Sequence, residues 1–289
     1  FKDTKRKMDN TFQSVNFKIL NFLKLNIKFF LMNLPNFILN RRIILKKKGF
    51  NNWENFNFTG EKYYINKHVV NIEKEFDYII DIGANIGEWT QLILPKKNKK
   101  TKIIMVEPQI KCLEKLKILK KKFSSIYILN RAVSDKNKFL DIYFETPGSQ
   151  LASLVQSKNI LSRWKKNSKK KIFRQRIKSI TIQKLYKKFK IKKKKKVFLK
   201  IDVEGIEDTV LINLLNSNIN FHEIMFEFNP QNYQSIFNLF ENLKKKKFKF
   251  KLFKLLPFKK GVEEIVVKKS LFPKLYCNLL LKNLANIFE

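Results

Sequence analysis

Asp81-Ile-Gly-Ala-Asn-Ile-Gly87 is the stretch that decides the fold of this chain. It follows a short apolar run, Tyr78-Ile79-Ile80, which favours a β-strand, and it precedes a helical pattern over residues 88–94 that ends at Pro95. Two of the chain's seven glycines lie in this stretch, four positions apart. A strand, a glycine turn and a helix N-terminus in this order predict the nucleoside- or phosphate-binding corner of a doubly wound α/β domain.

The composition is that of a folded and strongly basic chain. Its 289 residues fit one large domain with extensions, and an apolar fraction of 44% with 28 Phe is ample for a core. A formal charge of +38 and a pI near 10.1 would suggest nucleic acid or an anionic membrane as partner. The excess is almost all lysine, in company with abundant Asn, Ile and Phe, which is the mixture that AT-rich coding produces. We therefore interpret the charge mainly as background, with a functional basic face as the alternative.

Three parts of the chain are distinguished by sequence. Residues 1–60 form a Lys/Asn/Phe-rich helical N-terminal extension, residues 61–270 the α/β domain, and residues 271–289 an apolar C-terminal helical tail. Lysines and a proline interrupt the apolar run at 17–39, so no spanning helix is expected there, although a basic amphipathic helix on a membrane surface is an alternative. Two distant cysteines without a CxxC indicate neither zinc nor a disulfide framework and favour a reducing, cytoplasmic location.

Strand-like and helical patterns alternate through the α/β domain. Strand-like runs occupy 78–82, 102–106, 126–133, 138–144, 172–177, 197–202, 222–228, 248–255 and 262–267, and helical patterns occupy 88–94, 109–122, 181–190, 206–216 and 231–245. Such alternation predicts a mostly parallel sheet that is covered on both faces. The last two strand-like runs are separated by a loop with Pro257 and Gly261, which predicts a terminal antiparallel hairpin.

Acidic residues follow several of these strands at the point where each ends. Glu107 comes directly after 102–106, Asp202 and Glu204 end the run at 197–202, and Glu227 ends the run at 222–228. Ligands bind at the carboxyl edge of open α/β sheets, and an acid after the second strand accepts hydrogen bonds from both ribose hydroxyls. We therefore expect one acidic, nucleoside-binding pocket at this edge. Polar strand ends without a function are the alternative.

The motifs together resemble the FkbM-type S-adenosylmethionine-dependent methyltransferases. The resemblance is carried, from about residue 61 to 267, by the strings DIGANIGEWT at 81–90, VEP at 106–108, NRAVSD at 130–135, LKIDVEGIEDTVL at 199–211 and EFNP at 227–230. It implies a Rossmann-like, doubly wound, seven-stranded sheet, mostly parallel with a C-terminal antiparallel hairpin. It also implies bound S-adenosyl-L-methionine and O-methylation of a hydroxyl of a sugar, glycan or other small molecule.

The cofactor is expected to lie along the glycine loop. DxGxNxG lacks the third, helix-packing glycine of GxGxxG, and S-adenosylmethionine has no pyrophosphate, so a dehydrogenase is disfavoured. Glu107 is expected to hold the ribose, and Arg131 and Ala132 to flank the adenine by resemblance. The full set of expected cofactor-binding residues is Asp81, Gly83, Ala84, Asn85, Gly87, Glu107, Arg131, Ala132 and Asp202.

Methyl transfer to an alcohol needs alignment and a base. Asp202 is the first candidate for the catalytic carboxylate, and Glu204 and Glu227 are the alternates; a role of Asp202 in ordering the cofactor alone stays open. His68 could reach the site from a lid-like segment, whereas His222 precedes its strand and is expected to be structural. The three carboxylates could converge on a metal, but without histidines the pattern is unspecific and no metal is expected.

Two other functions are kept as alternatives. An RNA methyltransferase could use the basic surface, but the NPPY-like loop of enzymes that flip a base is missing after 197–202, where the sequence reads IDVEG. An acidic edge is also unfavourable for a phosphate backbone, so nucleic acid is not the expected partner. A non-catalytic module that binds the cofactor or a membrane surface is the third interpretation.

Overall fold

The computed structural model describes residues 41, 43–50, 56, 58–70, 76–95, 100–150, 152–154, 172–217, 219–257 and 260–284. The chain divides into two compact units, Phe1–Lys48 and Gly49–Glu289. In the first unit, residues 43–47 are helical. The expected amphipathic segment at 17–39 lies outside the described residues. No helix among the described residues is long and apolar enough to cross a membrane.

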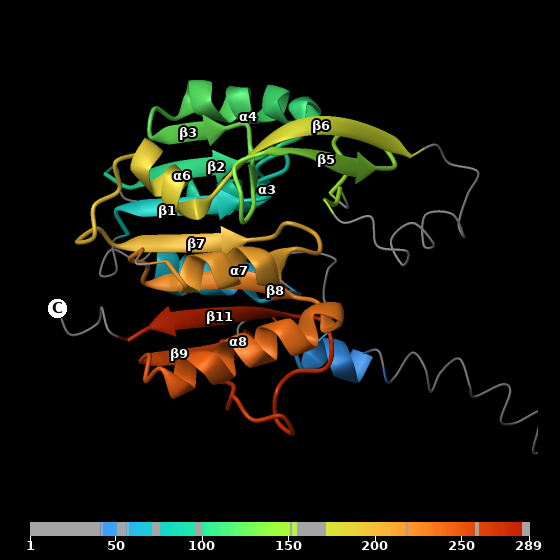
Figure 1. Cartoon of the computed structure of the whole chain (residues 1–289), viewed down its shortest axis with the longest axis vertical. Helices are drawn as coiled ribbons and strands as arrows, with labels where there is room; N and C mark the ends of the chain where they lie inside the picture. Colours follow the sequence, from blue (N-terminus) through green and yellow to red (C-terminus); the bar gives the residue numbers. More distant parts are fainter. Residues whose placement is uncertain are drawn as a thin grey trace, which may run out of the picture. The chain divides into compact units, whose positions relative to one another are not determined.

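The second unit is built on an eight-stranded sheet in the order β10-β9-β11-β8-β7-β1-β2-β3 (Figure 1). Its central strands are β1 (Tyr78–Ile82), β2 (Lys102–Val106), β3 (Ile126–Leu129), β7 (Val197–Ile201) and β8 (Glu223–Phe228). These five pair in parallel, so their carboxyl ends share one edge. The chain order reverses between β1 and β7, which places the ligand-binding crevice of such a sheet beside these two strands.

Antiparallel strands complete one side of the sheet. The expected hairpin forms between β9 (Phe250–Leu255) and β10 (Val262–Glu264). The strand β11 (Cys277–Asn283) lies between β9 and β8 and pairs antiparallel with both. The sheet is thus the mostly parallel, Rossmann-like sheet that was predicted, and β10 is a short additional edge strand.

The helical interpretation of residues 271–289 was wrong for the segment that forms β11. Leu279, Leu280 and Leu281 are all fully buried. Because neighbouring side chains of a strand point to opposite faces of the sheet, both faces of β11 are covered. Leu279 and Leu281 pack on one face of the sheet and Leu280 on the other. A central strand is apolar on both faces, so its sequence has no alternation of apolar and polar residues. Periodicity therefore does not distinguish such a strand from a buried helix.

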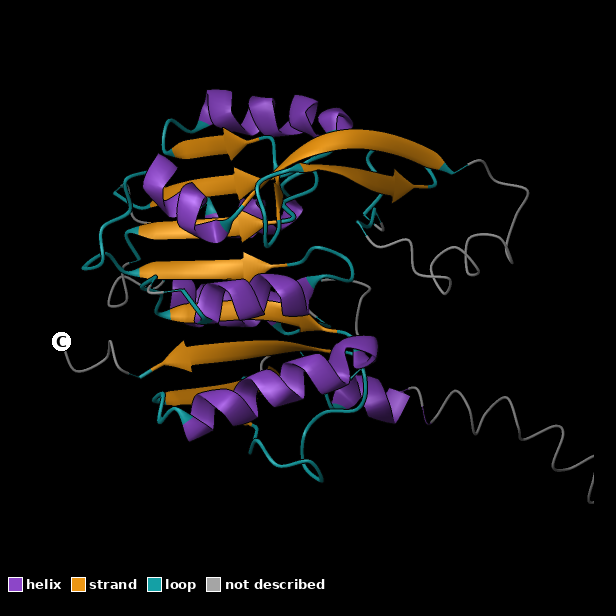
Figure 2. Ribbon diagram, in the orientation of Figure 1, coloured by secondary structure: helices purple, strands orange, loops and turns teal. Residues whose placement is uncertain are grey.

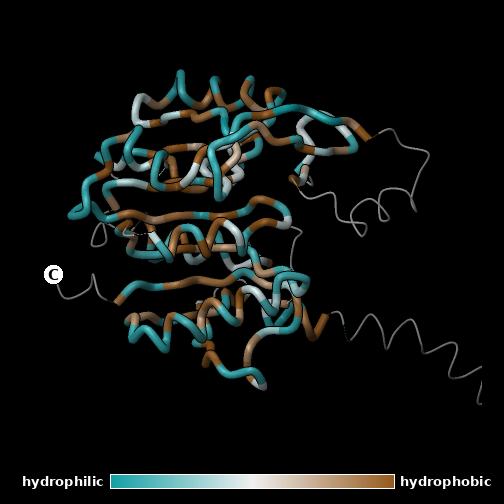
Figure 3. Tube along the Cα trace, in the orientation of Figure 1, coloured by the Kyte–Doolittle hydropathy of each residue, from teal (hydrophilic) through white to brown (hydrophobic). Residues whose placement is uncertain are grey.

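Helices cover both faces of the sheet (Figure 2). One apolar core contains residues of α6 (Ile182–Lys188), α7 (Glu207–Leu215) and α8 (Tyr233–Lys245). The other contains residues of α2 (Glu61–Tyr64), the π-helical turn η1 (Ile65–Val69), α3 (Glu88–Ile93) and α4 (Ile110–Lys122). Figure 3 shows the corresponding pattern, with apolar stretches along the central strands and more polar ones on the outer helices.

A second, three-stranded sheet lies beside the large one. It has the order β4-β6-β5, with β4 (Ala132–Val133), β5 (Phe139–Phe144) and β6 (Phe173–Ile180). The expectation that residues 126–133 form one strand was therefore wrong, because the chain turns at Asn130 and Arg131 and enters the smaller sheet. This smaller sheet has its own apolar core, which includes the side chains of Ile142, Phe144 and Ile177.

Candidate functional site

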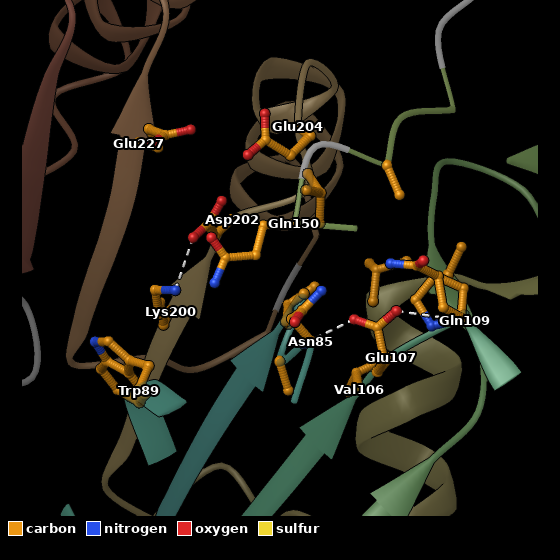
Figure 4. Close-up of a pocket in the computed structure, with 18 of the residues that line it drawn as sticks. Asn85, Trp89, Val106, Glu107, Gln109, Gln150, Lys200, Asp202, Glu204 and Glu227 are labelled. Carbon is orange, nitrogen blue, oxygen red and sulfur yellow. Dashed lines mark hydrogen bonds and ion pairs between the residues drawn. The ribbon is translucent and has the colours of Figure 1, made fainter. Parts of the chain in front are cut away.

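A cavity of about 810 Å³ opens where the glycine loop and the carboxyl ends of β1, β2, β7 and β8 meet. This is within the usual size of a small-molecule or cofactor site. Figure 4 shows two groups of side chains in it, Asn85, Glu107 and Gln109 on one side and Lys200, Asp202, Glu204 and Glu227 on the other.

The glycine loop is fixed to the ends of two strands. The backbone N–H groups of Gly83 and Ala84 donate to the carbonyl of Val106 at 2.9 and 3.1 Å. Gly83 has φ +84°, and a Cβ atom there would lie 1.6 Å from the backbone oxygen of Asp202. Only glycine permits this approach, so the loop after β1 is held against the loop after β7.

Glu107 organises the first side of the cavity. Its Oε2 accepts the backbone N–H of Asn85 at 2.8 Å, and its Oε1 accepts that of Gln109 at 2.9 Å. Burial raises the pKa of Glu107 to about 7, although these two N–H groups favour the charged form. Each carboxylate oxygen still has a lone pair, so Glu107 can accept further hydrogen bonds from a diol such as a ribose.

A loop at Gly148 and Ser149 is tied to the same group of residues. Gln109 Nε2 donates to the Ser149 carbonyl at 2.9 Å, and Gln109 Oε1 accepts the Gly148 N–H at 3.0 Å. Asn85 Nδ2 donates to the Ser149 carbonyl at 3.3 Å. Asn85 and Gln109 therefore hold the loop beside Glu107.

The second side of the cavity is acidic. Asp202, Glu204 and Glu227 each offer a carboxylate oxygen, and these three atoms lie within 4.8 Å of one another. Burial, followed by the charges of Asp202 and Glu204, raises the pKa of Glu227 well above its usual range. Oxygen ligands in such a set could hold a hard divalent cation.

Lys200 is a buried cation within this acidic side. It is 7% exposed, and its Nζ donates to Asp202 Oδ2 at 2.8 Å. Burial opposes its charge, but the carboxylates of Asp202, Asp81 and Glu61 outweigh burial and hold the pKa of Lys200 above its usual value. Lys200 also lies 5.6 Å from the ring centroid of Trp89. The ammonium group therefore keeps Asp202 in a fixed position.

Glu207 shapes the loop that carries Glu204. It is 1% exposed, and its carboxylate accepts the backbone N–H groups of Val203 at 3.2 Å and of Gly205 at 3.0 Å. Burial raises the pKa of Glu207 to about 7. Glu204 itself adopts φ +53°, a conformation that non-glycine residues seldom adopt.

Most of the predicted site residues are brought together in this cavity. Those in its lining are Gly83, Ala84, Asn85, Glu107, Arg131, Ala132, Asp202, Glu204 and Glu227. Their individual roles stay predictions.

Asp81 and Gly87 lie outside the lining. Asp81 is fully buried, and its Oδ2 accepts the hydroxyl of Thr90 at 2.7 Å, so it fixes the start of α3 to β1. Gly87 has φ +82°, and a Cβ there would lie 2.6 Å from the Leu119 side chain, which indicates that this glycine lets the loop pack on α4.

Neither histidine is part of the cavity lining. His222 directly precedes β8 at the opposite edge of the sheet, and its Nδ1 accepts the Val197 N–H at 3.4 Å, as its expected structural role requires. His68 lies in the turn η1, and its ring centroid is 4.8 Å from that of Tyr64 in α2.

Sequence reasoning gave no site role to several polar or aromatic residues of the lining, among them Glu61, Trp89, Gln109 and Lys200. For Lys200 a signal was available, because a lysine inside an apolar strand is unusual and needs a counter-charge. No local signal marked Glu61, which is 5% exposed and accepts the hydroxyl of Thr59 at 2.6 Å.

The fold and this site define a Rossmann-like methyltransferase domain, in which a glycine loop, an acid after β2 and an acidic loop after β7 surround one cavity. Residues 81–250 match the methyltransferase FkbM domain family. The chain therefore belongs to the FkbM methyltransferase family. No curated protein matches it in sequence.

The solved structures to which the chain is similar are distant in sequence. The FkbM methyltransferase of Methylobacillus flagellatus is 13% identical with a TM-score of 0.40, and the match covers 71% of this chain and 43% of that chain. A SAM-dependent O-methyltransferase of Thermotoga maritima is 11% identical with a TM-score of 0.31, and the match covers 72% of this chain and 60% of the other. The precorrin-6y C5,15-methyltransferase of Geobacter metallireducens is 8% identical with a TM-score of 0.36, covering 81% and 94%.

Proposed function

We propose that this protein transfers a methyl group from S-adenosyl-L-methionine to a hydroxyl of a sugar, a glycan or another small molecule. The observation that carries the proposal is a cavity that has hydrogen-bond acceptors around Glu107 on one side and the carboxylate of Asp202 on the other. A methyl donor and a hydroxyl acceptor need these two kinds of surface next to each other.

The residues around the glycine loop fit the cofactor. Glu107 has acceptor capacity for the ribose hydroxyls, and Gly83, which has no side chain, lies close to the backbone carbonyl of Asp202. The side chains of Val106, Val133 and Ile142 supply apolar surface for the adenine. When bound, the cofactor supplies an electrophilic methyl group on a sulfonium.

Asp202 is the proposed base. Its carboxylate accepts the proton of the acceptor hydroxyl while the oxygen forms its bond to the methyl group. Lys200, 2.8 Å away, orients this carboxylate. Glu204 and Glu227 can accept hydrogen bonds from neighbouring hydroxyls of the acceptor, which favours a polyol over a substrate with one hydroxyl.

The acidic lining does not favour RNA as the substrate. The described residues of the lining include only two basic side chains, Arg131 and Lys200, so a phosphate backbone would find few partners there. The acidic side chains of the lining are Glu61, Glu88, Glu107, Asp202, Glu204 and Glu227.

The function is tested by methyl transfer with the whole chain. Cofactor carrying a tritiated methyl group is incubated with separate glycan, small-molecule and RNA fractions of a cell extract. We expect label in a glycan or small-molecule fraction with the unchanged protein and with Glu114→Gln, an exposed position on α4, and a large loss with Asp202→Asn. Label that appears only in RNA, or an unchanged rate in Asp202→Asn, would contradict the proposal.

A further inference from the structure

Residues 266–275, which lie between β10 and β11, expose aliphatic side chains to solvent. Val266 is 58% exposed, Leu271 61% and Leu275 37%. Nine large apolar side chains are exposed among the described residues, and three of the nine lie within these ten positions. A single exposed leucine is common on a protein surface, whereas several in one short segment indicate a surface that binds a partner.

The same segment is basic. Lys268, Lys269 and Lys274 are exposed, and the sequence contains no acid between Glu264 and Glu289. Lysine is abundant in the whole chain, so its presence here carries little by itself. The combination matters: aliphatic side chains and cations alternate along one exposed segment, without an acid in the segment to balance the charge.

The inward side chains of the segment fix it to α8. Phe272 is 2% exposed, and its ring centroid lies 5.8 Å from that of Tyr233 and 5.5 Å from that of Phe237. The hydroxyl of Tyr233 also donates to the carbonyl of Lys269 at 3.2 Å. Since Phe272 is buried in this cluster of rings, its neighbour Leu271 is left on the outside. A partner that binds the exposed side chains does not have to order the backbone first.

The exposed side chains suit a lipid bilayer better than other partners of a basic surface. Nucleic-acid sites stack bases on aromatic and arginine side chains, and the strongest contacts of protein interfaces use the same residue types. The exposed positions of this segment hold only valine, leucine, lysine and serine. Aliphatic side chains enter the boundary between headgroups and acyl chains, while lysine ammonium groups stay at the level of the lipid phosphates. Anionic lipids supply the counter-charge.

We propose that residues 266–275 dock this protein on an anionic lipid bilayer, with Leu271 and Leu275 inserted below the headgroups and the three lysines at the phosphates. The segment ends at the cavity, because Leu275 directly precedes Tyr276, which belongs to the cavity lining. Docking therefore brings the cavity close to the membrane surface. The inference goes beyond the proposed function and does not rest on methyl transfer, and it concerns other residues than the amphipathic segment expected at 17–39.

The first test is sedimentation of the whole chain with vesicles of phosphatidylcholine, alone or mixed with phosphatidylglycerol. It compares the unchanged chain, the double variant Leu271→Ser with Leu275→Ser, and the control Ile118→Ser. Ile118 is also exposed among lysines, but the exposed acid Glu114 lies four positions earlier on the same face of α4. α4 lies at the other end of the large sheet (Figure 1). Thermal unfolding of each variant identifies any loss of fold.

We expect the unchanged chain to bind the vesicles that contain phosphatidylglycerol and not those of phosphatidylcholine alone. The double variant should bind at least about tenfold more weakly, because each inserted leucine contributes roughly three- to tenfold through the apolar area it removes from water. Ile118→Ser should change binding by less than about twofold. Added salt should weaken the binding of all three forms, since it screens the attraction between lysine and lipid phosphate.

The second test places an environment-sensitive dye on the segment. The native thiols of Cys112 and Cys277 are buried, so under native conditions the dye reacts with an introduced cysteine. In Leu271→Cys the emission should shift to the blue when vesicles with phosphatidylglycerol are added, because the dye enters an apolar environment. In the control Ile118→Cys the emission should stay unchanged.

Three results would overturn the inference. If the chain does not bind the anionic vesicles, there is no docking. If the double variant binds as tightly as Ile118→Ser, or if the dye at position 271 does not respond while the chain sediments, another part of the chain holds the bilayer. If that dye responds to added RNA but not to vesicles, the segment binds nucleic acid. Each of these results leaves the proposed methyl transfer untouched.

Discussion

Three glycines with nearly equal backbone conformations allow the steric reasoning about the cofactor loop to be tested. Gly83, Gly87 and Gly148 have φ values of +84°, +82° and +87°. Alanine at each position pays a similar conformational cost of about 1–2 kcal/mol. The three positions differ in what the new Cβ would contact, so differences among the variants report on packing.

The expected losses rise from Gly148 to Gly83. At Gly148 the nearest atom, Lys111 Cγ, is 3.7 Å from the new Cβ, which is an ordinary contact, so Gly148→Ala should cost only the conformational term. At Gly87 the Cβ would lie 2.6 Å from Leu119 Cδ1, and overpacking against a movable side chain adds about 1–3 kcal/mol.

Gly83→Ala should be the most damaging. The Asp202 carbonyl, 1.6 Å from the new Cβ, must retreat by roughly 1.4 Å to reach the 3.0 Å limit of real contacts. Such a shift disturbs the hydrogen bonds of Asp202 N–H to Ile82 and of Gly83 N–H to Val106. About 1 kcal/mol for each hydrogen bond adds to the conformational cost of about 1–2 kcal/mol and to an overpacking cost of about 1–3 kcal/mol. The total is about 4–7 kcal/mol, a large part of a typical stability.

The assays are urea unfolding and calorimetric binding of S-adenosylmethionine. The free energy of unfolding should fall in the order Gly148→Ala, Gly87→Ala, Gly83→Ala, and Gly83→Ala should also lose most of its cofactor affinity. Equal losses in all three variants would refute the steric argument, because only the shared φ cost would then matter.

Four further results are expected. Glu107→Ala should weaken cofactor binding in calorimetry by roughly ten- to a hundredfold, from lost hydrogen bonds to a charged group, and unchanged affinity would refute the ribose role. Between pH 4.5 and 7 the free energy of unfolding should fall as pH rises, by up to about 3 kcal/mol for each of Glu107 and Glu207. The reason is that burial raises the pKa of each folded carboxyl to about 7, so the unfolded carboxyl loses its proton first. Urea unfolding at several pH values should show that the free energy of unfolding falls less steeply with pH in Glu207→Gln than in the unchanged chain. Lys200→Met should lower turnover and stability more than Lys254→Met, since Lys254 is equally buried but pairs with a single exposed acid outside the cavity, and equal losses would refute a special role for Lys200. Turnover should be unchanged by EDTA, whereas a loss that Mg²⁺ restores would identify the three clustered carboxylates as metal ligands.

The central part of the fold could be predicted because its signals are local. The apolar runs of β1, β2, β7 and β8 end in polar residues, and the glycine turn after β1 has few alternatives. The parallel arrangement then brings the strand ends to one edge, which is why Glu107 and Asp202 were expected in a shared pocket. Both are in its lining.

The parts that were missed depend on distant contacts. Residues 277–283 form the strand β11 because β8 and β9 both pair with this segment. The sequence of the segment alone does not show that these two partners are available. Glu61 reaches the cavity from a segment before the FkbM match. Its importance comes from its charge interaction with Lys200, and the position of Lys200 is determined by the pairing between strands. Local periodicity contains neither piece of information.

The position of β11 also limits how the chain can fold during synthesis. Among the described strands, β9 and β10 reach the rest of the sheet only through β11, although both are made earlier than β11. The hairpin of β9 and β10 therefore keeps the edge of β9 unpaired until residues 277–283 have left the ribosome. An unpaired edge of this kind is a site for aggregation, so translation that stops before residue 277 should yield a protein that depends on chaperones even though the whole glycine loop is present.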